Sequence, residues 1–359
     1  MDKLDEARAA IDRIDAQMAT LFEARMAAVA AVAAYKKEHA LPVLDSAREG
    51  EVVEKNLARL KNQELAPFYA DYIRYQMALS RQYQAQVLGR DRVAYQGVEG
   101  AFAHIALKKL FPRAQELPCA TWGKVFDAVE AGDAAYGVLP FENSHAGDVS
   151  AVLDLCFAHP GLYVTEVCDL PVRQNLLGLP GARLSDITRV CSHPQAIAQS
   201  ERFLKSLSLP AEDCLNTAVA AKKVAESGDK ALAAIASEET AALYGLQVLA
   251  ADINSDGDNT TRFIVIGREL PVSGDRFSLL FTVDHKAGKL AAAIQAIGAA
   301  GFNMECIKSR PMPGVPFEYY FYVELEGQPG AQGTKALLNE LERVCNTLRV
   351  LGIFTRRQP

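Results

Sequence analysis

The sequence predicts a multidomain protein with an all-helical N-terminal domain, an α/β middle domain and a smaller α+β C-terminal domain. Residues 1–88 are rich in helix formers and show no strand-like alternation. From about residue 90 to 270, short apolar runs alternate with amphipathic stretches, which predicts strands and helices around a sheet. The remainder follows the order strand, helix, strand, strand, helix, strand, which is a ferredoxin-like arrangement.

Three helices are expected in the first domain. The first runs from about Leu4 to His39, the second from Asp45 or Ser46 to Leu60, and the third from Pro67 to about Val87. A first helix of this length cannot bury its apolar face within so small a domain. We therefore expect two copies of the chain to pair through this domain.

One face of the first helix carries cations among apolar residues. Steps of three and four select Arg8, Ile11, Asp15, Met18, Phe22, Arg25, Val29, Val32 and Lys36. A buried cation without a partner is costly, so these cations indicate an anionic ligand inside a helical bundle. The alternative is that they extend along a polar flank into solvent.

The spacing of these cations predicts two sites rather than one. At about 1.5 Å per residue, Arg25 and Lys36 lie roughly 16 Å apart and nearly in line, so their side chains can converge on one ligand. Arg8 lies roughly 25 Å from Arg25 along the helix, beyond the reach of a small molecule. We expect Arg8 to serve the site of a dimer partner.

Composition excludes several classes of function. The net charge of −6 and the lack of a long basic run argue against nucleic acid as a partner. The N-terminus has no apolar signal segment, and we expect no segment long and apolar enough to span a membrane. The seven cysteines are scattered without metal-binding spacing, so we expect reduced thiols, a cytoplasmic protein and no metal or organic cofactor.

Four polar motifs accompany the expected strands of the middle domain. The strands are Arg92–Tyr95, Ala135–Leu139, Thr188–Ser192, Ala231–Ala236 and Arg262–Ile266. The motifs are a glycine-containing turn over 95–102, the segment 139–144 with Glu142, Asn143 and Ser144, the segment 192–195 with His193 and Gln195, and the segment 258–263. Taken singly, each is compatible with an ordinary tight turn or a helix cap.

The helical domain resembles the chorismate mutase domain of the all-helical, dimeric class over residues 4–88. The matching residues are Arg8, Arg25, Lys36, Asp45, Arg48, Glu49, Ser80 and Gln84. The resemblance implies an intertwined dimer with shared sites, in which the dianion chorismate rearranges to prephenate without a nucleophile or a proton transfer.

The resemblance also implies a role for each residue of this chorismate site. Arg25, Arg48 and the partner's Arg8 would bind carboxylates, and Ser80 would support one of them. Lys36 and Gln84 would donate hydrogen bonds to the ether oxygen. Asp45 and Glu49 would hold the region of the ring hydroxyl.

In their order, the four motifs of residues 90–270 resemble the prephenate dehydratase domain, most tellingly through Thr261-Arg262-Phe263. The resemblance implies two α/β lobes, as in periplasmic binding proteins, with the site in the cleft. A threonine hydroxyl is a weak acid, so Thr261 is interpreted as a hydrogen-bond donor or relay to the departing hydroxyl. Glu142 and His193 are candidate proton sources. The candidate prephenate ligands are Glu142, Asn143, Ser144, Asn175, Gln195, Thr260, Thr261, Arg262 and Phe263, with Arg262 either binding a carboxylate or serving the structure.

Residues 275–357 resemble an ACT domain, a small ligand-sensing module that pairs side by side in dimers. The matching positions are Ala287, Gly288, Leu290, Ser309 and Arg310, which implies phenylalanine bound at the pairing interface. Lys289 and Lys308 depart from the family, where a small residue and a glutamate are usual. Feedback inhibition by phenylalanine is expected, and pure dimerisation is the alternative.

Together the resemblances identify a bifunctional chorismate mutase–prephenate dehydratase with domains at 1–89, 90–270 and 275–357. We expect it to convert chorismate to prephenate and prephenate to phenylpyruvate, as a homodimer or a higher even oligomer with L-phenylalanine as effector. Three alternatives stay open. They are a dehydratase whose helical domain is only regulatory, a bilobed solute-binding protein with an amino-acid sensor, and an enzyme that dehydrates arogenate.

Overall fold

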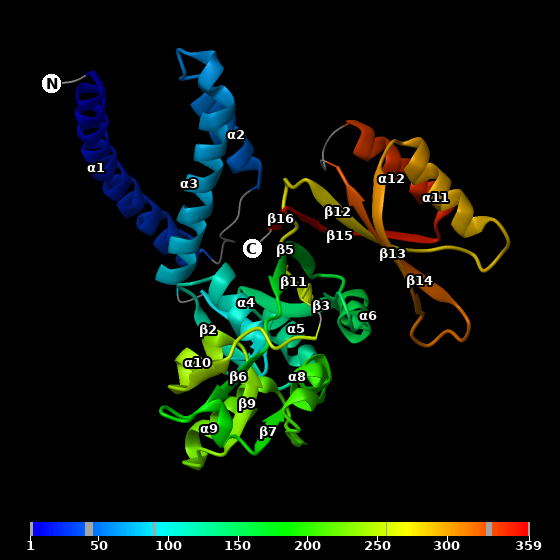
Figure 1. Ribbon diagram of the computed structural model, residues 1–359. Coiled ribbons are helices and arrows are strands. Elements are labelled where there is room, and N and C mark those ends of the chain that lie inside the picture. Colours follow the sequence, from blue (N-terminus) through cyan, green and yellow to red (C-terminus); the bar gives the residue numbers. More distant parts are fainter. Residues whose placement is uncertain (1–2, 40–45, 89–90, 256, 328–331, 358–359) are drawn as a thin grey trace. The chain divides into compact units, whose positions relative to one another are not determined.

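The computed structural model describes residues 3–39, 46–88, 91–255, 257–327 and 332–357. The chain divides into two compact units, Met1–Arg92 and Val93–Pro359, which Figure 1 shows in blue to cyan and in cyan to red. Each unit is described by itself below.

The first unit confirms the three expected helices, α1 (Lys3–Glu38), α2 (Ser46–Leu57) and α3 (Ala66–Val87), with a short 3₁₀ turn at Gln63–Leu65. Asn62 caps that turn, because its side chain accepts a hydrogen bond from the backbone N–H of Glu64. Both α1 and α2 pack against α3.

Helix α1 exposes most of its apolar residues. Ala33 is its one buried residue among those described. The large side chains exposed along it are Leu4, Ile11, Ile14, Met18, Leu21, Phe22, Val32 and Tyr35. Within one chain, α1 therefore leaves uncovered the face that the sequence predicts to be a packing seam.

The expectation that no segment is long and apolar enough to span a membrane is wrong, because α1 meets both criteria by its length and composition. The most apolar part of Lys3–Glu38 has a mean hydropathy of 1.3. Apolar core helices of soluble proteins pass the same test, and α1 packs against α3 through part of its length.

The second unit contains two α/β lobes and a C-terminal module. The first lobe has the strand order β2-β1-β3-β11-β5 and the helices α4–α6, and the second lobe has the order β10-β6-β9-β7-β8 and the helices α7–α10. The first lobe comprises β1 (Arg92–Gln96), α4 (Phe102–Leu110), β2 (Gln115–Cys119), α5 (Trp122–Ala131), β3 (Tyr136–Asn143), β4 (Gly147–Asp148), α6 (Ser150–Ala158), β5 (Tyr163–Pro171) and β11 (Thr260–Gly267). The second lobe comprises β6 (Asn175–Gly178), β7 (Arg189–Ser192), α7 (Pro194–Gln199), α8 (Glu201–Ser206), β8 (Ala211–Asp213), α9 (Thr217–Ser227), β9 (Leu232–Ala236), α10 (Glu238–Tyr244) and β10 (Gln247–Ala250).

Two segments without regular secondary structure connect the lobes, at residues 172–174 and at residues 251–255 and 257–259. They are bonded to each other: the N–H of Val172 donates to the carbonyl of Asn259 at 2.8 Å, and the N–H of Ile253 donates to the carbonyl of Gln174 at 2.8 Å. The second crossing leads directly into β11, so the segment 258–263 enters the first lobe beside the junction of the two lobes.

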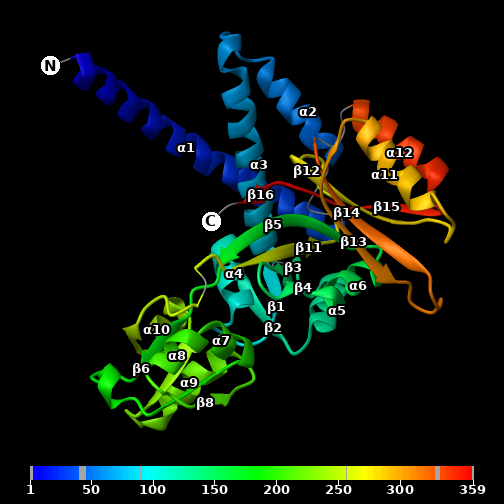
Figure 2. The ribbon, with the colours of Figure 1, turned by 45° about the vertical axis from the view of Figure 1, so that its right-hand side comes forward.

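The C-terminal module confirms the predicted order of strands and helices. It comprises β12 (Arg276–Thr282), α11 (Lys289–Ala299), β13 (Asn303–Pro311), β14 (Tyr319–Glu326), α12 (Gln332–Val344) and β15 (Thr347–Phe354). Its sheet has the order β13-β14-β12-β15, and α11 and α12 lie side by side on one face of it (Figures 1 and 2).

A close backbone contact joins the module to the first lobe. Strand β15 pairs with β5 in parallel at Gly352 and Val164, and β16 (Arg356–Arg357) continues along β5. A Cβ atom on Gly352 would lie 2.5 Å from the carbonyl oxygen of Val164. Only glycine allows this approach, and the sheet is thereby continuous from the module into the lobe.

The sequence prediction differs from the structure in some elements. The stretch 196–206 is amphipathic, and it belongs to two short helices that meet at Ser200. Strand β5, which lies between β11 and β15, was not predicted, although its buried residues Val164, Val167, Cys168 and Leu170 alternate imperfectly with polar ones.

Candidate functional site

In the helical unit, α1 and α3 bring Arg25 and Ser80 together. Arg25 Nη1 donates to Ser80 Oγ at 2.5 Å, and Ser80 in turn donates to the carbonyl of Gln76 at 2.7 Å. Gln84 lies one turn further along α3 and is 8% exposed. Its Oε1 atom has no hydrogen-bond partner in the described part of the chain. A cation, a hydroxyl and an amide therefore face one region between α1 and α3.

The other predicted chorismate ligands are placed differently. Arg8 is exposed, Lys36 is half-buried, and Arg48 is exposed with Glu51 3.5 Å away. Asp45 and the side chain of Glu49 lie outside the described residues.

In the second unit, strands β3 and β11 bring Asn143 and Thr261 together as register partners. Asn143 Nδ2 donates to Thr261 Oγ1 at 2.9 Å and to Asn259 Oδ1 at 2.7 Å. The oxygen of the same amide, Oδ1, accepts the backbone N–H groups of His145 and Ala146 at 3.0 and 2.9 Å. All four contacts agree on which end of the Asn143 amide is the donor. The hydroxyl oxygen of Thr261 therefore accepts a hydrogen bond from the Asn143 NH2 group.

The hydroxyl proton of Thr261 is therefore free to be donated elsewhere. Ser144 and Thr260 close the adjacent turn, because the N–H of Thr260 donates to Ser144 Oγ at 3.0 Å. His145 Nε2 lies 3.0 Å from Asp258 Oδ1 beside the same turn. Asn259 is 4% exposed, and its Nδ2 has no partner among the described residues.

Arg262 and Glu142 lie on the opposite face of the sheet from Thr261 and Asn143. Side chains alternate along a strand, so Thr261 shares a face with Phe263, and Arg262 shares a face with Ile264. The two faces pack into different clusters: Phe263 lies with Tyr95 and residues of α4, and Ile264 lies with residues of α5, α6 and β14.

Arg262 is surrounded by carboxylates on its face. Its Nε donates to Asp169 Oδ1 at 3.0 Å, and its Nη1 lies 3.7 Å from Glu142 and 4.0 Å from Glu324. Burial alone would raise the pKa of Asp169, but the bonds from Arg262 and Arg356 outweigh it and hold that pKa below its usual value. Phe263 is 2% exposed and is a core residue, away from any open surface.

The predicted residues of the second lobe are not joined to Thr261 by a contact in the described chain. Asn175 is buried, accepts the N–H of Asp252 at 3.0 Å and donates to the carbonyl of Ala236 at 3.4 Å. His193 caps α7, where its Nδ1 accepts the N–H of Gln195 at 3.2 Å. Gln195 itself is exposed.

The glycine turn over 97–101 has the structural role that the sequence also allowed. Gly97 and Gly100 have φ values of 111° and 87°, which favour glycine. The N–H groups of Gly97, Gly100 and Ala101 are bonded to Cys119, His104 and Val98 within the chain. The carbonyl of Gly100 accepts from Thr240 of the second lobe at 2.9 Å, so the turn holds the lobes together.

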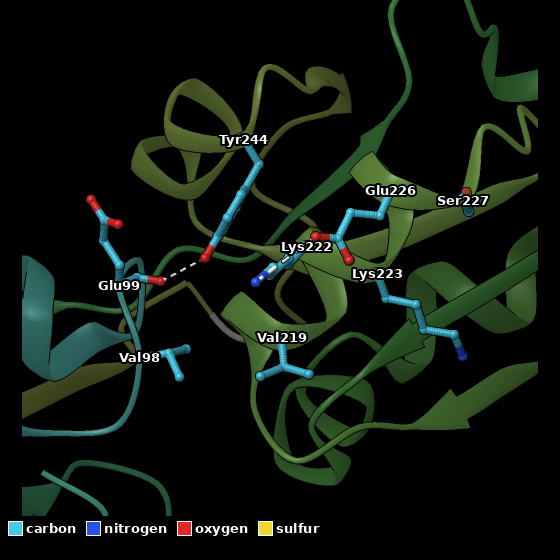
Figure 3. A pocket seen from close by; sticks show the side chains of 8 residues that line it. All are labelled: Val98, Glu99, Val219, Lys222, Lys223, Glu226, Ser227 and Tyr244. Atoms are coloured by element: carbon cyan, nitrogen blue, oxygen red, sulfur yellow. Dashed lines mark hydrogen bonds and ion pairs between the residues drawn. The ribbon is translucent and has the colours of Figure 1, made fainter. Parts of the chain in front are cut away.

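A pocket of about 760 Å³ adjoins this turn (Figure 3). It is lined by Val98, Glu99, Val219, Lys222, Lys223, Glu226, Ser227 and Tyr244. Tyr244 donates to the carbonyl of Glu99 at 3.0 Å across it, and Lys222 pairs with Glu226 at 3.8 Å. The predicted prephenate ligands are not among its lining residues.

In the C-terminal module, one of the predicted effector positions, Arg310, is held by another group of the chain. Arg310 donates to both carboxylate oxygens of Asp154 in α6, at 3.0 and 2.6 Å. Gly288 begins α11 with a φ of 82°, and a Cβ atom there would meet open space. Ala287 and Ser309 are exposed, and Leu290 is half-buried.

Sequence reasoning missed four residues around Thr261 and Arg262. They are Asn259, His145, Asp169 and Arg356. Asn259 lies within the motif 258–263 and His145 directly follows the motif 139–144, so proximity to Thr261 and Asn143 could have found them. Asp169 and Arg356 carry no local pattern, because only the pairing of β5 with β11 and β16 brings them to Arg262.

Two family models match successive parts of the chain. The family model of type II chorismate mutase matches residues 7–85, and that of prephenate dehydratase matches residues 93–271. A bifunctional chorismate mutase/prephenate dehydratase of Aquifex aeolicus is 32% identical over 99% of both chains.

Other relatives match about three quarters of the chain. An Arabidopsis thaliana arogenate dehydratase/prephenate dehydratase is 37% identical over 74% of this chain and 73% of its own length. A crystal structure of a prephenate dehydratase from Arthrobacter aurescens in complex with L-Phe is 28% identical, covers 74% of this chain and 90% of that chain, and has a TM-score of 0.68.

Proposed function

This chain belongs to the family of bifunctional chorismate mutases/prephenate dehydratases and carries both activities, and we propose the residues that perform each reaction. The chain rearranges chorismate to prephenate and converts prephenate to phenylpyruvate. We assign the first reaction to the domain 1–89, the second to the domain 90–270, and regulation to an ACT domain at 275–357.

The mutase site lies between α1 and α3 in this proposal. Arg25 binds a carboxylate of chorismate, with Ser80 holding the guanidinium in place through the 2.5 Å hydrogen bond. Lys36 and Gln84 donate to the ether oxygen, where negative charge develops as the C–O bond breaks. The amide of Gln84 suits this role because it donates at any pH. Asp45, Arg48 and Glu49 complete the site from α2 and the segment before it.

The mutase site also requires a second chain. The apolar side chains exposed along α1 and the distance from Arg8 to Arg25 support an intertwined homodimer, in which the partner's Arg8 binds a carboxylate. The seven free cysteines fit a protein of the cytoplasm.

The dehydratase site centres on Thr261. Prephenate loses its ring carboxylate as carbon dioxide, and the electron pair of that C–C bond enters the ring while the ring hydroxyl leaves as hydroxide. The enzyme has to stabilise the leaving oxygen and supply it with a proton. Because Thr261 Oγ1 accepts from Asn143, its own proton points to the substrate and hydrogen-bonds the leaving oxygen.

Asn143 and Asn259 position this hydroxyl. The backbone N–H groups of His145 and Ala146 and the Oδ1 of Asn259 hold the Asn143 amide in one orientation. This chain of contacts is the single observation that carries the assignment. Glu142 is engaged by Arg262 and Lys308 on the other face, at 3.7 and 3.2 Å, and we do not assign it as the proton source.

Two substitutions in the full-length protein test the two-site assignment. Thr261→Ala should abolish phenylpyruvate formation and leave chorismate consumption unchanged. Arg25→Ala should abolish chorismate consumption and leave the conversion of prephenate to phenylpyruvate unchanged, because the two residues belong to separate compact units. Rates are measured by feeding chorismate and prephenate separately. If either substitution removed both activities in a folded protein, the assignment of two independent sites would be wrong.

For the C-terminal module we propose binding of L-phenylalanine and feedback inhibition. The ferredoxin-like order of the module and the related dehydratase that was crystallised with L-Phe support this. Titrating L-phenylalanine against the dehydratase rate, with calorimetry for binding, tests it. A constant rate without measurable binding would leave the module as a dimerisation element.

A second candidate substrate for the dehydratase is arogenate. The 37% identity to an arogenate dehydratase/prephenate dehydratase favours a comparison of the two substrates. The kcat/KM values for prephenate and arogenate, measured on the same enzyme preparation, decide between them. We expect prephenate to be preferred, because the mutase unit of the same chain produces it.

A further inference from the structure

Arg262 and Thr261 are neighbours in the family motif, but they serve different faces of β11. Thr261 faces the cluster of Phe263 and Tyr95, and Arg262 faces the cluster that includes Tyr320 and Tyr322 of the C-terminal module. A substrate held at the hydroxyl of Thr261 is therefore separated from the guanidinium of Arg262 by the sheet.

The charge of Arg262 is also compensated within the chain. Its side chain is 17% exposed, and Asp169, at 3.0 Å, is 13% exposed. Glu142 and Glu324 lie within 4.0 Å of its Nη1 atom. A guanidinium with a buried carboxylate at hydrogen-bond distance and two more nearby has no need of a substrate carboxylate.

Asp169 links Arg262 to the C-terminal strand. One carboxylate oxygen, Oδ1, accepts from Arg262, and the other, Oδ2, accepts from Nε and Nη2 of Arg356 at 2.7 and 2.5 Å. Strand β16 brings Arg356 to this position by pairing with β5 at Val167, two residues before Asp169. The side chain of Arg356 is 29% exposed, and its Nη1 lies 3.7 Å from Glu305 of β13.

Two further charged residues near this cluster, Lys308 and Glu324, come from the C-terminal module. Lys308 of β13 lies 3.2 Å from Glu142, pairs with Asp148 and is 7% exposed. Glu324 of β14 is 2% exposed and accepts from Tyr322 at 3.1 Å. The strand that carries Thr261 is therefore held on its far face by residues of three strands of the module, β13, β14 and β16.

We propose that Asp169 and Arg356 are positioning residues of the dehydratase: through Asp169, the C-terminal strand holds Arg262 and thereby fixes β11 so that Thr261 meets the leaving hydroxyl. In this arrangement Arg262 is a structural ligand of the chain and does not bind prephenate. The inference rests on the role of Thr261 proposed above. It predicts that losing Arg356 lowers the rate of the chemical step and not the affinity for substrate.

The test uses the full-length protein with Arg356→Met, Arg356→Lys, Asp169→Asn and the double variant Arg356→Met/Asp169→Asn. Arg343→Met is the matched control, because Arg343 is 76% exposed in α12 and pairs only with Glu340 among the described residues. The kcat and KM for prephenate are measured for each variant, the thermal unfolding of each variant reports whether the second unit is folded, and the mutase rate serves as an internal reference for enzyme concentration.

We expect Arg356→Met to lower kcat about tenfold with KM within about twofold, because a small displacement of a catalytic group is costly. Arg356→Lys should recover part of the loss. The double variant should be no slower than Asp169→Asn alone, because Arg356 acts through Asp169. A kcat for Arg356→Met equal to that of Arg343→Met, or additive losses in the double variant, would overturn the proposal.

Arg262→Gln separates the two roles of that residue. If Arg262 held a substrate carboxylate, this variant would raise KM by about tenfold or more with kcat retained, and the proposal would be wrong. A fall in kcat with KM retained supports positioning. Failure of the wild-type enzyme to turn over prephenate would instead count against the role of Thr261, and the two failures are thus distinct.

Discussion

Asn143 and Thr261 face each other across strands β3 and β11, and the amide of Asn143 donates to the threonine hydroxyl at 2.9 Å. The proposed dehydratase site depends on the direction of this hydrogen bond, because it leaves the hydroxyl proton available to a substrate. A site that uses a threonine hydroxyl as a donor has to keep that proton from being given to the protein.

Asn143→Asp reverses this hydrogen bond almost without a change in shape. The carboxylate still accepts the N–H groups of His145 and Ala146, but it accepts the proton of Thr261 instead of donating to it. We expect a loss of about a hundredfold or more in dehydratase kcat. Part of the rate should return on acidification, as the new carboxyl group becomes protonated. A pH–rate profile parallel to that of the wild type would contradict this.

The shared mutase site can be tested by mixing inactive chains. Arg8→Ala and Arg25→Ala homodimers should both lack mutase activity. Co-refolded mixtures should regain up to about a quarter of wild-type activity, because a heterodimer has one intact site and random pairing makes half of the dimers mixed. Dehydratase activity, which should stay constant, is the control. No recovery in mixtures whose mixed dimers are demonstrated would refute the contribution of the partner's Arg8.

Gly352→Ala should destabilise the joint between the C-terminal sheet and the first lobe. The new methyl group would lie 2.5 Å from the carbonyl oxygen of Val164, and backbone on both sides has to shift. We expect a loss of about 1–3 kcal/mol in unfolding free energy. Gly298→Ala is the control, since it meets open space in α11 and should stabilise by up to about 1 kcal/mol. Thermal unfolding measures both, and equal unfolding temperatures would contradict the prediction.

Glu324 makes the stability of the second unit depend on pH. Burial raises the pKa of its carboxyl above the usual value, against the attraction of Arg262. The folded state therefore keeps a proton that the unfolded chain releases, and this contribution to stability is lost as pH rises through the folded pKa. Glu324→Gln should raise the unfolding temperature more at about pH 8 than at about pH 5. Glu326→Gln, at the exposed end of β14, should change neither.

Much of the fold could be predicted from local pattern. The three helices of the first unit and the six elements of the C-terminal module follow from runs of helix formers and from alternation, and the structure has them within a few residues. Strand β5 was missed because its pairing partners, β11 and β16, come far later in the chain and leave no local pattern.

The candidate site was predicted less completely, for a reason visible in β11. All three residues of the motif Thr261-Arg262-Phe263 are candidate ligands in the sequence prediction, with a structural role left open for Arg262, but a strand sends successive side chains to opposite faces. One member donates toward the substrate in our proposal, one binds Asp169, and one is 2% exposed in the core. The alternation of the side chains could be predicted from the sequence. The residues that cover each face of the strand could not.

The sequence by itself determined the family and both activities. It also predicts the helical seam of Arg8, Arg25 and Lys36 and the role of Thr261, because these depend on residue type and on spacing along one element. The tertiary structure alone decided which neighbours each side chain has. Asp169 and Arg356 lie 93 and 94 residues from Arg262 in the chain, and they meet it because β5 is paired on one side with β11 and on the other with β16. Such pairings are long-range contacts, which a local pattern does not encode.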